Sequence, residues 1–298
     1  MSRLYFSDMA TRLAFFVGSW VLGHIALLAQ AFTVYNTGAE VDGDFQASGG
    51  VCLMGGASES DDAMMWFLGR AGGGDVLVLR ASGSDGYNNY MYSDLGVDIH
   101  RVTTVVCQAP SASYNDEVLS LVEGAEAIWF AGGDQADYHN LWQGTPLNDA
   151  INDALTQRSV VIGGTSAGMA ILGGMRFTAQ NGTVYTDEAL SDPYNTYMTL
   201  DNTPFLEVPV LANTFTDTHF DNPDRRGRLL AFLARASQDW GTPATAIACD
   251  EYTAVCIDES GLARGLEKRR NTTTTRTSSR STVPLRTPHP RCAVQGNP

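Results

Sequence analysis

The sequence predicts an α/β fold in which a mostly parallel sheet carries helices on both faces. Short apolar runs, such as 75–80 and 127–131, alternate with segments of helical length and pattern. Glycine pairs follow several of these runs, as at Gly55-Gly56 and Gly132-Gly133. Strands that alternate with helices favour parallel pairing, because each crossover helix covers one face of the sheet. Functional residues of such sheets lie beyond the carboxyl ends of the strands.

The elements follow one another in a regular order. Before residue 170 we expect strands over 50–56, 75–80, 102–106, 127–131 and 160–162, and helices over 63–71, 116–122, 136–142 and 146–156. After residue 200 we expect a strand over 208–215, a helix over 221–236, and a final hairpin of strands 244–250 and 253–257 around Asp250-Glu251-Tyr252.

The first 31 residues differ from the rest of the chain. Arg3 and Arg12 precede an apolar run from Leu13 to Leu28, and Ala29-Gln30-Ala31 has the pattern of a cleavage site. A membrane anchor is the alternative, but the run is short for a span, which needs about 20 residues. We therefore expect residues 1–31 to be a signal peptide, cleaved near Ala31, of an exported protein.

The remainder divides into three parts by composition. Residues 32–48 are polar and glycine-rich, and we expect a flexible lead-in. Residues 49–267 carry the strand and helix patterns and form the α/β domain. Residues 268–298 contain seven basic and no acidic side chains among Thr and Ser repeats, so we expect a disordered basic tail.

Charge limits the partners of this domain. Residues 32–267 contain ten basic and 32 acidic side chains, which gives a net charge of −22. A surface this acidic repels nucleic acid and anionic lipid. We expect no nucleic-acid partner, and no membrane contact once the signal peptide is removed.

The five cysteines do not predict a metal site. Cys52, Cys107 and Cys256 fall in apolar, strand-like runs, where a thiol usually packs as a small hydrophobic group. No C-x-x-C or Cys/His ligand spacing is present, so we expect no metal, no cofactor and no disulfide framework. The odd number leaves at least one free thiol, and a Cys249–Cys256 bridge stays open.

The strongest chemical signal is Gly164-Thr165-Ser166-Ala167-Gly168. An apolar run precedes this G-x-S-x-G pattern and a helical pattern follows it. In that context the pattern is typical of a nucleophile elbow, whose serine hydroxyl projects from a sharp strand-to-helix turn. The simpler interpretation is a turn with a serine N-cap. We predict Ser166 as a nucleophile, with the N–H groups of Ala167 and Gly133 stabilising an oxyanion.

A catalytic serine needs a base and a carboxylate. Of the three histidines in residues 32–267, His219 ends a strand-like run, whereas His100 and His139 fit surface or capping positions better. The chain order Ser, acid, His places the acid between Ser166 and His219. The candidates there are Asp187, Glu188, Asp192, Asp201, Glu207 and Asp217.

Several motifs resemble the cyanophycinase and aspartyl dipeptidase (dipeptidase E) family of serine peptidases. In chain order these are Gly132-Gly133-Asp134-Gln135, Gly164-Thr165-Ser166-Ala167-Gly168, and Asp217-Thr218-His219-Phe220 with the arginines that follow it. The early stretch around Gly55-Gly56 and the late stretch around Asp250-Glu251-Tyr252 also resemble the family. The resemblance covers about residues 50–260.

This resemblance implies a flavodoxin-like fold related to class I glutamine amidotransferases, and specific roles. Ser166 would be the nucleophile, His219 the base, and Glu188 the acid, with Asp187 as the fallback. Asp134 and Gln135 would line the pocket, and Arg225 and Arg228 would hold the aspartate part of the substrate, as arginine forks suit carboxylates. The implied substrate is a small acidic peptide or an aspartyl polymer, and the implied assembly is a homodimer.

Two departures keep other functions open. Pro223 stands where the cyanophycinase pattern has a further arginine, and the tract from Lys268 replaces a further apolar strand. A non-catalytic module that binds acidic ligands on the same fold is therefore one alternative. An α/β-hydrolase esterase that shares only the elbow is another, although the chain lacks a His-Gly-Gly-Gly oxyanion loop.

Overall fold

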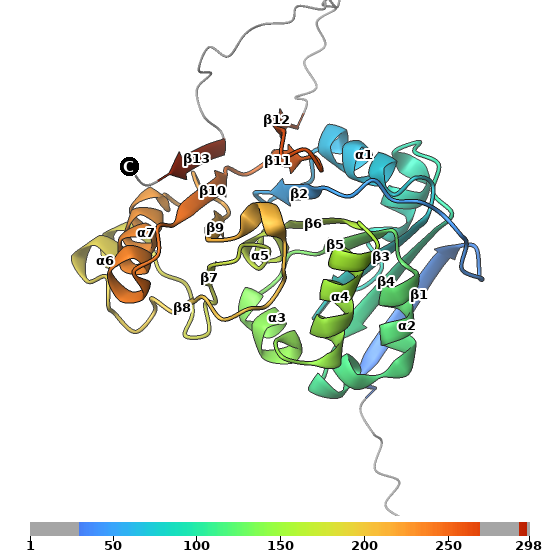
Figure 1. Cartoon of the computed structure of the whole chain (residues 1–298), viewed down its shortest axis with the longest axis horizontal. Helices are drawn as coiled ribbons and strands as arrows, with labels where there is room; N and C mark the ends of the chain where they lie inside the picture. The colour runs from blue at the N-terminus through green and yellow to red at the C-terminus, as the bar shows by residue number, and fades with distance from the viewer. Residues whose placement is uncertain (1–29, 269–291, 297–298) are drawn as a thin grey trace, which may run out of the picture.

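The computed structural model describes residues 30–268 and 292–296 (Figure 1). Its larger sheet has eight strands in the order β1-β4-β3-β5-β6-β2-β11-β12. These strands are β1 (Phe32–Gly38), β2 (Val51–Met54), β3 (Asp75–Arg80), β4 (Arg101–Cys107), β5 (Ala127–Phe130), β6 (Val161–Thr165), β11 (Thr253–Ile257) and β12 (Ala263–Glu267). The predicted signal peptide, apart from Gln30 and Ala31, lies outside the described residues.

The centre of this sheet is parallel. Strands β4, β3, β5, β6 and β2 run in one direction, and β1, β11 and β12 pair antiparallel at its two sides. The register sets Gly163 of β6 opposite Trp129 of β5. A Cβ on Gly163 would lie 2.6 Å from the Trp129 ring, so the glycine leaves room for the indole. The predicted mostly parallel α/β fold is confirmed.

Helices cover both faces of the larger sheet. Helix α1 (Asp61–Arg70) packs on the face that carries Val76 and Val78. Helices α2 (Asp116–Gly124), α3 (Gln135–Trp142) and α4 (Pro146–Gln157) pack on the opposite face, against Leu77 and Leu79. Because successive strand residues point to opposite faces, one apolar strand supplies both cores.

A second, smaller sheet lies beside the first (Figure 1). Its strands are β9 (Thr214–Asp217), β10 (Thr245–Cys249) and β13 (Cys292–Gly296), in the order β13-β10-β9. Around it lie helix α6 (Thr186–Ser191), helix α7 (Arg226–Trp240), and the short pair β7 (Arg176–Phe177) and β8 (Leu200–Asp201). A separate apolar core lies here, in which Phe232 stacks on Phe177 and packs at a tilt against Phe215.

Both expected flexible ends contain a strand. Within the predicted lead-in, β1 pairs with β4 along its whole length, because its backbone groups complete the open edge of β4. Within the predicted tail, β13 pairs with β10 from Thr245 to Cys249. The expectations of disorder over 32–48 and over the whole of 268–298 are therefore wrong at these two strands, whereas 269–291 lies outside the described residues.

The predicted final hairpin is also wrong, and the difference matters for the site. Strand β10 pairs with β9 and β13, whereas β11 pairs with β2 and β12. The turn at Asp250-Glu251-Tyr252 therefore passes from the smaller sheet to the larger one. Two other boundaries shift: the strand expected over 208–215 begins at Thr214, and the helix expected from 221 begins at Arg226.

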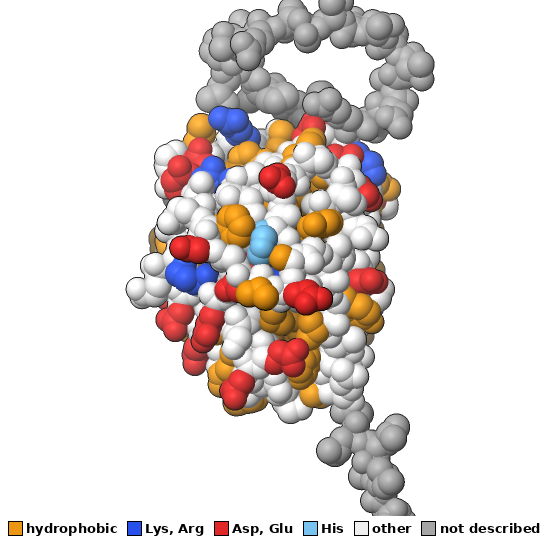
Figure 2. All heavy atoms as spheres, turned by 90° about the vertical axis from the view of Figure 1, so that its right-hand side faces the viewer, with side chains coloured by type: hydrophobic (Ala, Val, Ile, Leu, Met, Phe, Trp, Pro, Cys, Tyr) orange, Lys and Arg blue, Asp and Glu red, His pale blue; other side chains and the backbone are white. Residues whose placement is uncertain are grey.

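The surface reflects the composition. Figure 2 shows many acidic and few basic side chains scattered over one face of the molecule. Within residues 30–268 and 292–296, no helix is both long enough and apolar enough to cross a membrane.

Candidate active site

The nucleophile elbow lies at the carboxyl end of β6. Ser166 follows this strand with φ 53° and ψ −120°, a conformation that few L-residues adopt, and helix α5 (Ala167–Ala170) follows. The flanking glycines are required by space. A Cβ on Gly164 would lie 2.5 Å from the backbone of Gly168, and a Cβ on Gly168 would overlap the carbonyl oxygen of Phe130. The turn thus fixes the serine hydroxyl outward from the sheet.

His219 reaches this serine from the smaller sheet. It lies just beyond β9 with φ 47°, and its Nε2 is 2.8 Å from Ser166 Oγ. Its backbone N–H donates to the carbonyl oxygen of Gly55 at 2.8 Å. A Cβ on Gly56 would overlap the imidazole ring, so the predicted glycine turn after β2 makes room for the histidine.

A carboxylate holds the other side of the imidazole, and it is Glu251. Its Oε1 is 2.8 Å from His219 Nδ1, and its Oε2 accepts a hydrogen bond from Asn222 Nδ2 at 3.3 Å. The Glu251 backbone N–H donates to Asp221 Oδ1 at 3.0 Å. A carboxylate at Nδ1 directs Nε2 toward the serine as a proton acceptor and stabilises the imidazolium that then forms.

Glu188, the acid that the resemblance implied, does not lie against His219. It is exposed on the first turn of α6, where its Oε2 accepts from the backbone N–H of Tyr185 at 3.0 Å. The fallback, Asp187, is exposed on the same turn. The other candidates also have different surroundings: Asp201 pairs with Arg176 and Asp217 with Arg228. We therefore assign Glu251 in place of Glu188.

Glu251 was not among the predicted acids because the chain order Ser, acid, His places the acid between the serine and the histidine, whereas Glu251 follows His219. The signal was present, since Asp250-Glu251-Tyr252 directly follows the apolar run that becomes β10. Glu251 lies beyond the carboxyl end of β10, and His219 lies beyond the carboxyl end of the neighbouring strand β9. Both residues were therefore candidates for the same reason, because functional side chains gather at this edge of a parallel sheet.

The predicted oxyanion donors flank the serine. Ala167 opens α5 directly after Ser166, and Gly132-Gly133 follows β5, the neighbour of β6. A Cβ on Gly132 would lie 3.5 Å from the Ser166 Cβ, which shows how close this turn comes to the nucleophile. The two donor assignments, Ala167 and Gly133, remain predictions.

A cavity of about 340 Å³ opens over the serine. Its lining is mostly polar and comes from the β5, β6 and β9 ends and from the segments before α6 and α7: Gly133, Asp134, Gln135, Ser166, Ala179, Gly182, Thr183, Thr218, His219 and Arg225. This volume is at the small end of the usual range for ligand pockets, about 300–1,000 Å³. The site therefore suits a ligand of about dipeptide size.

Arg225 supplies the positive charge of this cavity. Its Nη1 donates to the carbonyl oxygen of Thr218 at 2.9 Å, whereas its buried Nε has no hydrogen-bond partner in the described residues. Burial, followed by the nearby charge of Arg228, lowers the pKa of Arg225 to about 10. The guanidinium therefore stays charged at neutral pH, with donor capacity left for an anion.

Arg228 does not reach the cavity, contrary to the prediction. It is 2% exposed, and its Nε and Nη2 bind the two carboxylate oxygens of Asp217, with 3.1 Å between Nε and Oδ2. Its Nη1 donates to Thr183 Oγ1 and to the Val184 carbonyl oxygen. All three guanidinium nitrogens thus hydrogen-bond within the protein, and one of these bonds positions Thr183, which lines the cavity.

The remaining predicted pocket residues divide in role. Asp134 caps α3, because its Oδ1 accepts from the backbone N–H of Ala136 at 2.9 Å. It also lines the cavity together with Gln135, the first residue of α3. Both therefore lie where the prediction placed them, although Asp134 has a structural function as well.

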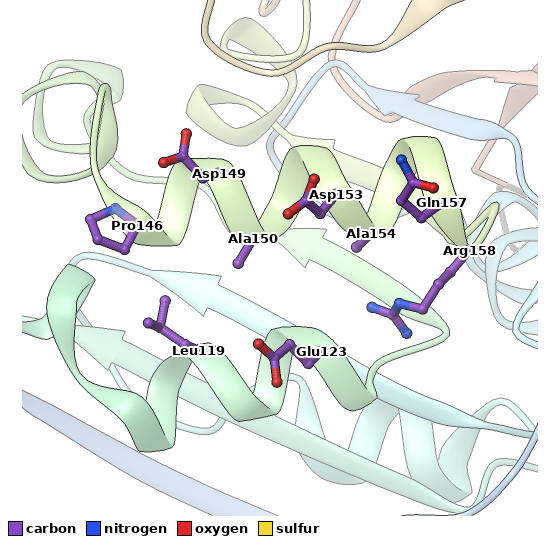
Figure 3. A pocket seen from close by; sticks show the side chains of 9 residues that line it. All are labelled: Leu119, Glu123, Pro146, Asp149, Ala150, Asp153, Ala154, Gln157 and Arg158. Carbon is purple, nitrogen blue, oxygen red and sulfur yellow. The ribbon is translucent and has the colours of Figure 1, made fainter.

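A larger hollow, of about 580 Å³, lies between α2 and α4 (Figure 3). Figure 3 shows Glu123 on α2 and, along the neighbouring helix α4, the side chains of Asp149 and Asp153. Arg158 at one end donates to the carbonyl oxygens of Ala125 and Val122. The lining contains no serine, cysteine or histidine, so this hollow has no hydroxyl or thiol nucleophile paired with a histidine base.

Comparison with known proteins agrees with the motifs. Residues 78–264 match the sequence profile of Peptidase family S51. The chain belongs to this family. It is 24% identical over 205 residues to the cyanophycinase of Synechococcus elongatus, an alignment that covers 67% of this chain and 59% of that protein. It is 21% identical over 228 residues to the cyanophycinase of Trichormus variabilis, covering 73% and 70%.

The fold has a solved counterpart. The crystal structure of a peptidase from an acI-B1 Actinobacterium superposes with a TM-score of 0.53 at 15% identity, over 75% of this chain and 90% of that one. The predicted family resemblance and flavodoxin-like fold are confirmed. The chain spans less than two thirds of the length of the Synechococcus relative.

Proposed function

We propose that this chain is a serine peptidase of cyanophycinase type, which hydrolyses peptide or isopeptide bonds beside an aspartate. One observation carries the proposal: Ser166 Oγ, the His219 imidazole and Glu251 form a continuous chain with 2.8 Å at each of its two links. Membership of Peptidase family S51 supports the reaction class.

In this mechanism Ser166 Oγ attacks the carbonyl carbon of the scissile bond. His219 Nε2 accepts the serine proton and delivers it to the leaving nitrogen, while Glu251 stabilises the imidazolium. The N–H groups of Ala167 and Gly133 bind the oxyanion. The amine product leaves, and His219 activates a water that attacks the acyl-enzyme and restores Ser166.

Arg225 would hold the carboxylate of the aspartyl part of the substrate. Its side chain lines the same cavity as Ser166, and a guanidinium in a small site suits a carboxylate. The domain is otherwise strongly acidic, at −22 over residues 32–267, so a cationic side chain in the cavity selects acidic groups locally.

Export is the second part of the proposal. We infer that residues 1–31 are a signal peptide removed near Ala31, which supports action outside the cytoplasm. The first residue of β1, Phe32, directly follows that position. Cleavage there leaves the whole of β1 on the mature chain, paired to β4.

The test combines a chemical probe with a substrate panel. Mature protein, residues 32–298, is treated with a fluorophosphonate, and the labelled peptide is identified by mass spectrometry. We expect label on Ser166 and hydrolysis of α- and β-aspartyl dipeptides, but not of matched glutamyl or asparaginyl dipeptides. His219→Ala should lose both activities. His100→Ala is the matched control, because His100 also pairs with a carboxylate, Asp75, but contacts no serine in the described residues.

A binding module remains the second candidate, on one observation. Arg228 is used by the fold and Pro223 replaces a further arginine of the cyanophycinase pattern, so Arg225 is the single arginine of the cavity lining. Saturable binding of aspartyl dipeptides by wild-type protein, with no label on Ser166 and no turnover, would establish this candidate instead. The esterase alternative loses support, because the acid follows the histidine in the chain.

A further inference from the structure

Strands β2 and β11 carry one buried cysteine each, and the two thiols face one another. Cys52 and Cys256 are register partners in the antiparallel β2–β11 pair, and their Sγ atoms are 3.7 Å apart. Their side chains are 0% and 1% exposed. The proposed peptidase mechanism uses neither thiol.

The backbone at this pair has the geometry that a disulfide needs. The Gly55 N–H donates to the Thr253 carbonyl oxygen at 3.0 Å, so Gly55 and Thr253 form a hydrogen-bonded pair. Pair types alternate along an antiparallel ladder, which makes Cys52 and Cys256, three positions away, a non-hydrogen-bonded pair. Cα atoms in such pairs are about 4.5 Å apart, within the range of about 4.4–6.8 Å that disulfides span.

We propose that Cys52 and Cys256 form a cross-strand disulfide when the chain folds in the presence of an oxidising low-molecular-weight disulfide. A thiolate of one cysteine attacks the compound RSSR, which forms a mixed disulfide and releases RS⁻. The second thiolate then attacks the protein sulfur of the mixed disulfide and releases the other RS⁻. Two protein thiols thereby lose two electrons and two protons, and RSSR is reduced to two RSH.

The burial of the pair determines when this bond forms. Helix α1 covers Cys52, whose Sγ lies 3.8 Å from the Ala63 carbonyl oxygen. Burial also raises the pKa of the Cys52 thiol well above its ordinary value, which suppresses the reactive thiolate. Oxidation therefore occurs during folding, before α1 packs on β2, and the finished bond is shielded from reductants.

The bond would join two strands that support the active site. Strand β2 leads into the Gly55-Gly56 turn against which the His219 ring lies, and β11 follows the turn that carries Glu251. The two cysteines are 204 positions apart in the sequence. A crosslink over so long a loop removes much conformational freedom from the unfolded chain.

The first measurement is peptide mapping of the wild-type chain. The protein is reduced, unfolded, and refolded in a buffer of reduced and oxidised glutathione, then alkylated and digested without reductant. We expect a linked peptide pair containing Cys52 and Cys256, lighter by two hydrogens than the two free peptides. Full alkylation of both residues, or linkage of either one to Cys107, Cys249 or Cys292, would overturn the proposal.

The second measurement is thermal unfolding of protein refolded with glutathione disulfide or with a phosphine reductant. Wild-type protein should unfold roughly 5–15 °C higher after oxidative refolding. Cys52→Ala should show no such difference, whereas Cys107→Ser, a change at another fully buried thiol, should retain it. Equal unfolding temperatures of the wild-type protein in both conditions would count against the bond. Peptide mapping decides the proposal even where Cys52→Ala does not fold.

Discussion

Two histidine–carboxylate pairs lie at opposite ends of the larger sheet. At the carboxyl end His219 Nδ1 is 2.8 Å from Glu251, and at the amino end His100 Nδ1 is 2.8 Å from Asp75. The two pairs are the same in their shortest contact. They differ in the groups that surround the rest of the imidazole ring.

The far nitrogen of His219 contacts Ser166, and a cavity with a guanidinium opens beside it. The His100 ring instead packs against Phe45, with 5.0 Å between ring centroids, and Asp75 also binds Arg101. A histidine–carboxylate pair at hydrogen-bonding distance therefore does not by itself mark the active site, since one lies at each end of the sheet. The strained elbow that aims a serine at Nε2 makes one pair suited to catalysis.

The largest expected effect separates the two histidines. His219→Ala should lower kcat/KM for an aspartyl dipeptide by about 10⁴–10⁶-fold, because the serine loses its proton acceptor. His100→Ala should change kcat/KM by less than about threefold at a temperature where the variant is folded. His100 lies at the opposite end of the sheet and shares no partner with the triad among the described residues, so its loss should not couple to the catalytic groups. Steady-state kinetics of both variants checks this. Comparable losses in the two variants would break the distinction between the pairs.

The next effect separates two glutamates. Glu251→Gln should lower kcat by about 10³–10⁴-fold, because the amide stabilises neither the required imidazole tautomer nor the imidazolium. Glu188→Gln should stay near wild type, since the side chain is exposed and its contact to the Tyr185 N–H is a local helix cap. A larger loss of kcat in Glu188→Gln would restore the acid that the family resemblance implied.

Substitutions of two neighbouring arginines should have different effects, one on substrate binding and the other on the stability of the fold. Arg225→Met should raise KM for aspartyl substrates about 10–100-fold, because a charged hydrogen bond to the substrate carboxylate is lost. Arg228→Met should instead lower the free energy of unfolding by about 3–5 kcal/mol, because Asp217 is left buried without its partner. Kinetics and urea denaturation of both variants measure the two effects. An unchanged KM in Arg225→Met would remove the proposed basis of substrate selection.

The smallest effect concerns the amino end of the sheet, where burial raises the pKa of Glu126. A carboxyl whose pKa is raised by folding contributes stability at low pH and loses it as pH rises through the folded pKa. Glu126→Gln removes this titration but keeps an acceptor for the Asp75 N–H. The variant should therefore gain stability relative to wild type over a pH range that begins near the ordinary pKa of a glutamate, about 4.3, and extends upward through the raised pKa of the folded state. Unfolding temperatures measured across this range test the sign.

The same comparison shows what the sequence could predict. The elbow at Ser166 is encoded locally, because its glycines, strand and helix are neighbours in the chain. His219 was also accessible, since it lies two residues beyond β9, which begins within a strand-like segment of the sequence. These features depend on turn sterics and strand ends, which a single sequence carries.

The acid and the second arginine depend on long-range geometry. Glu251 reaches His219 only because the chain passes from β10 in one sheet to β11 in the other, and strand pairing of that kind has no local signal. Arg225 and Arg228 look alike in sequence. They differ because α7 begins at Arg226, which leaves Arg225 before the helix and turns Arg228 toward Asp217.

Strands β1 and β13 were missed for a related reason. Each is a short side strand within a stretch whose overall composition is polar, and each is defined by a partner far away in the chain. Edge pairing depends on the open backbone groups of that partner rather than on the composition of the added segment.

The most direct test of the account is the rate at which a fluorophosphonate labels Ser166, followed by mass spectrometry in wild-type, Glu251→Gln and Glu188→Gln proteins. This rate reports activation of the serine without a natural substrate. We predict rapid labelling of the wild type and of Glu188→Gln, and labelling at least about 100-fold slower in Glu251→Gln. Equal rates in wild type and Glu251→Gln, or no label on the wild-type serine, would contradict the triad Ser166, His219 and Glu251.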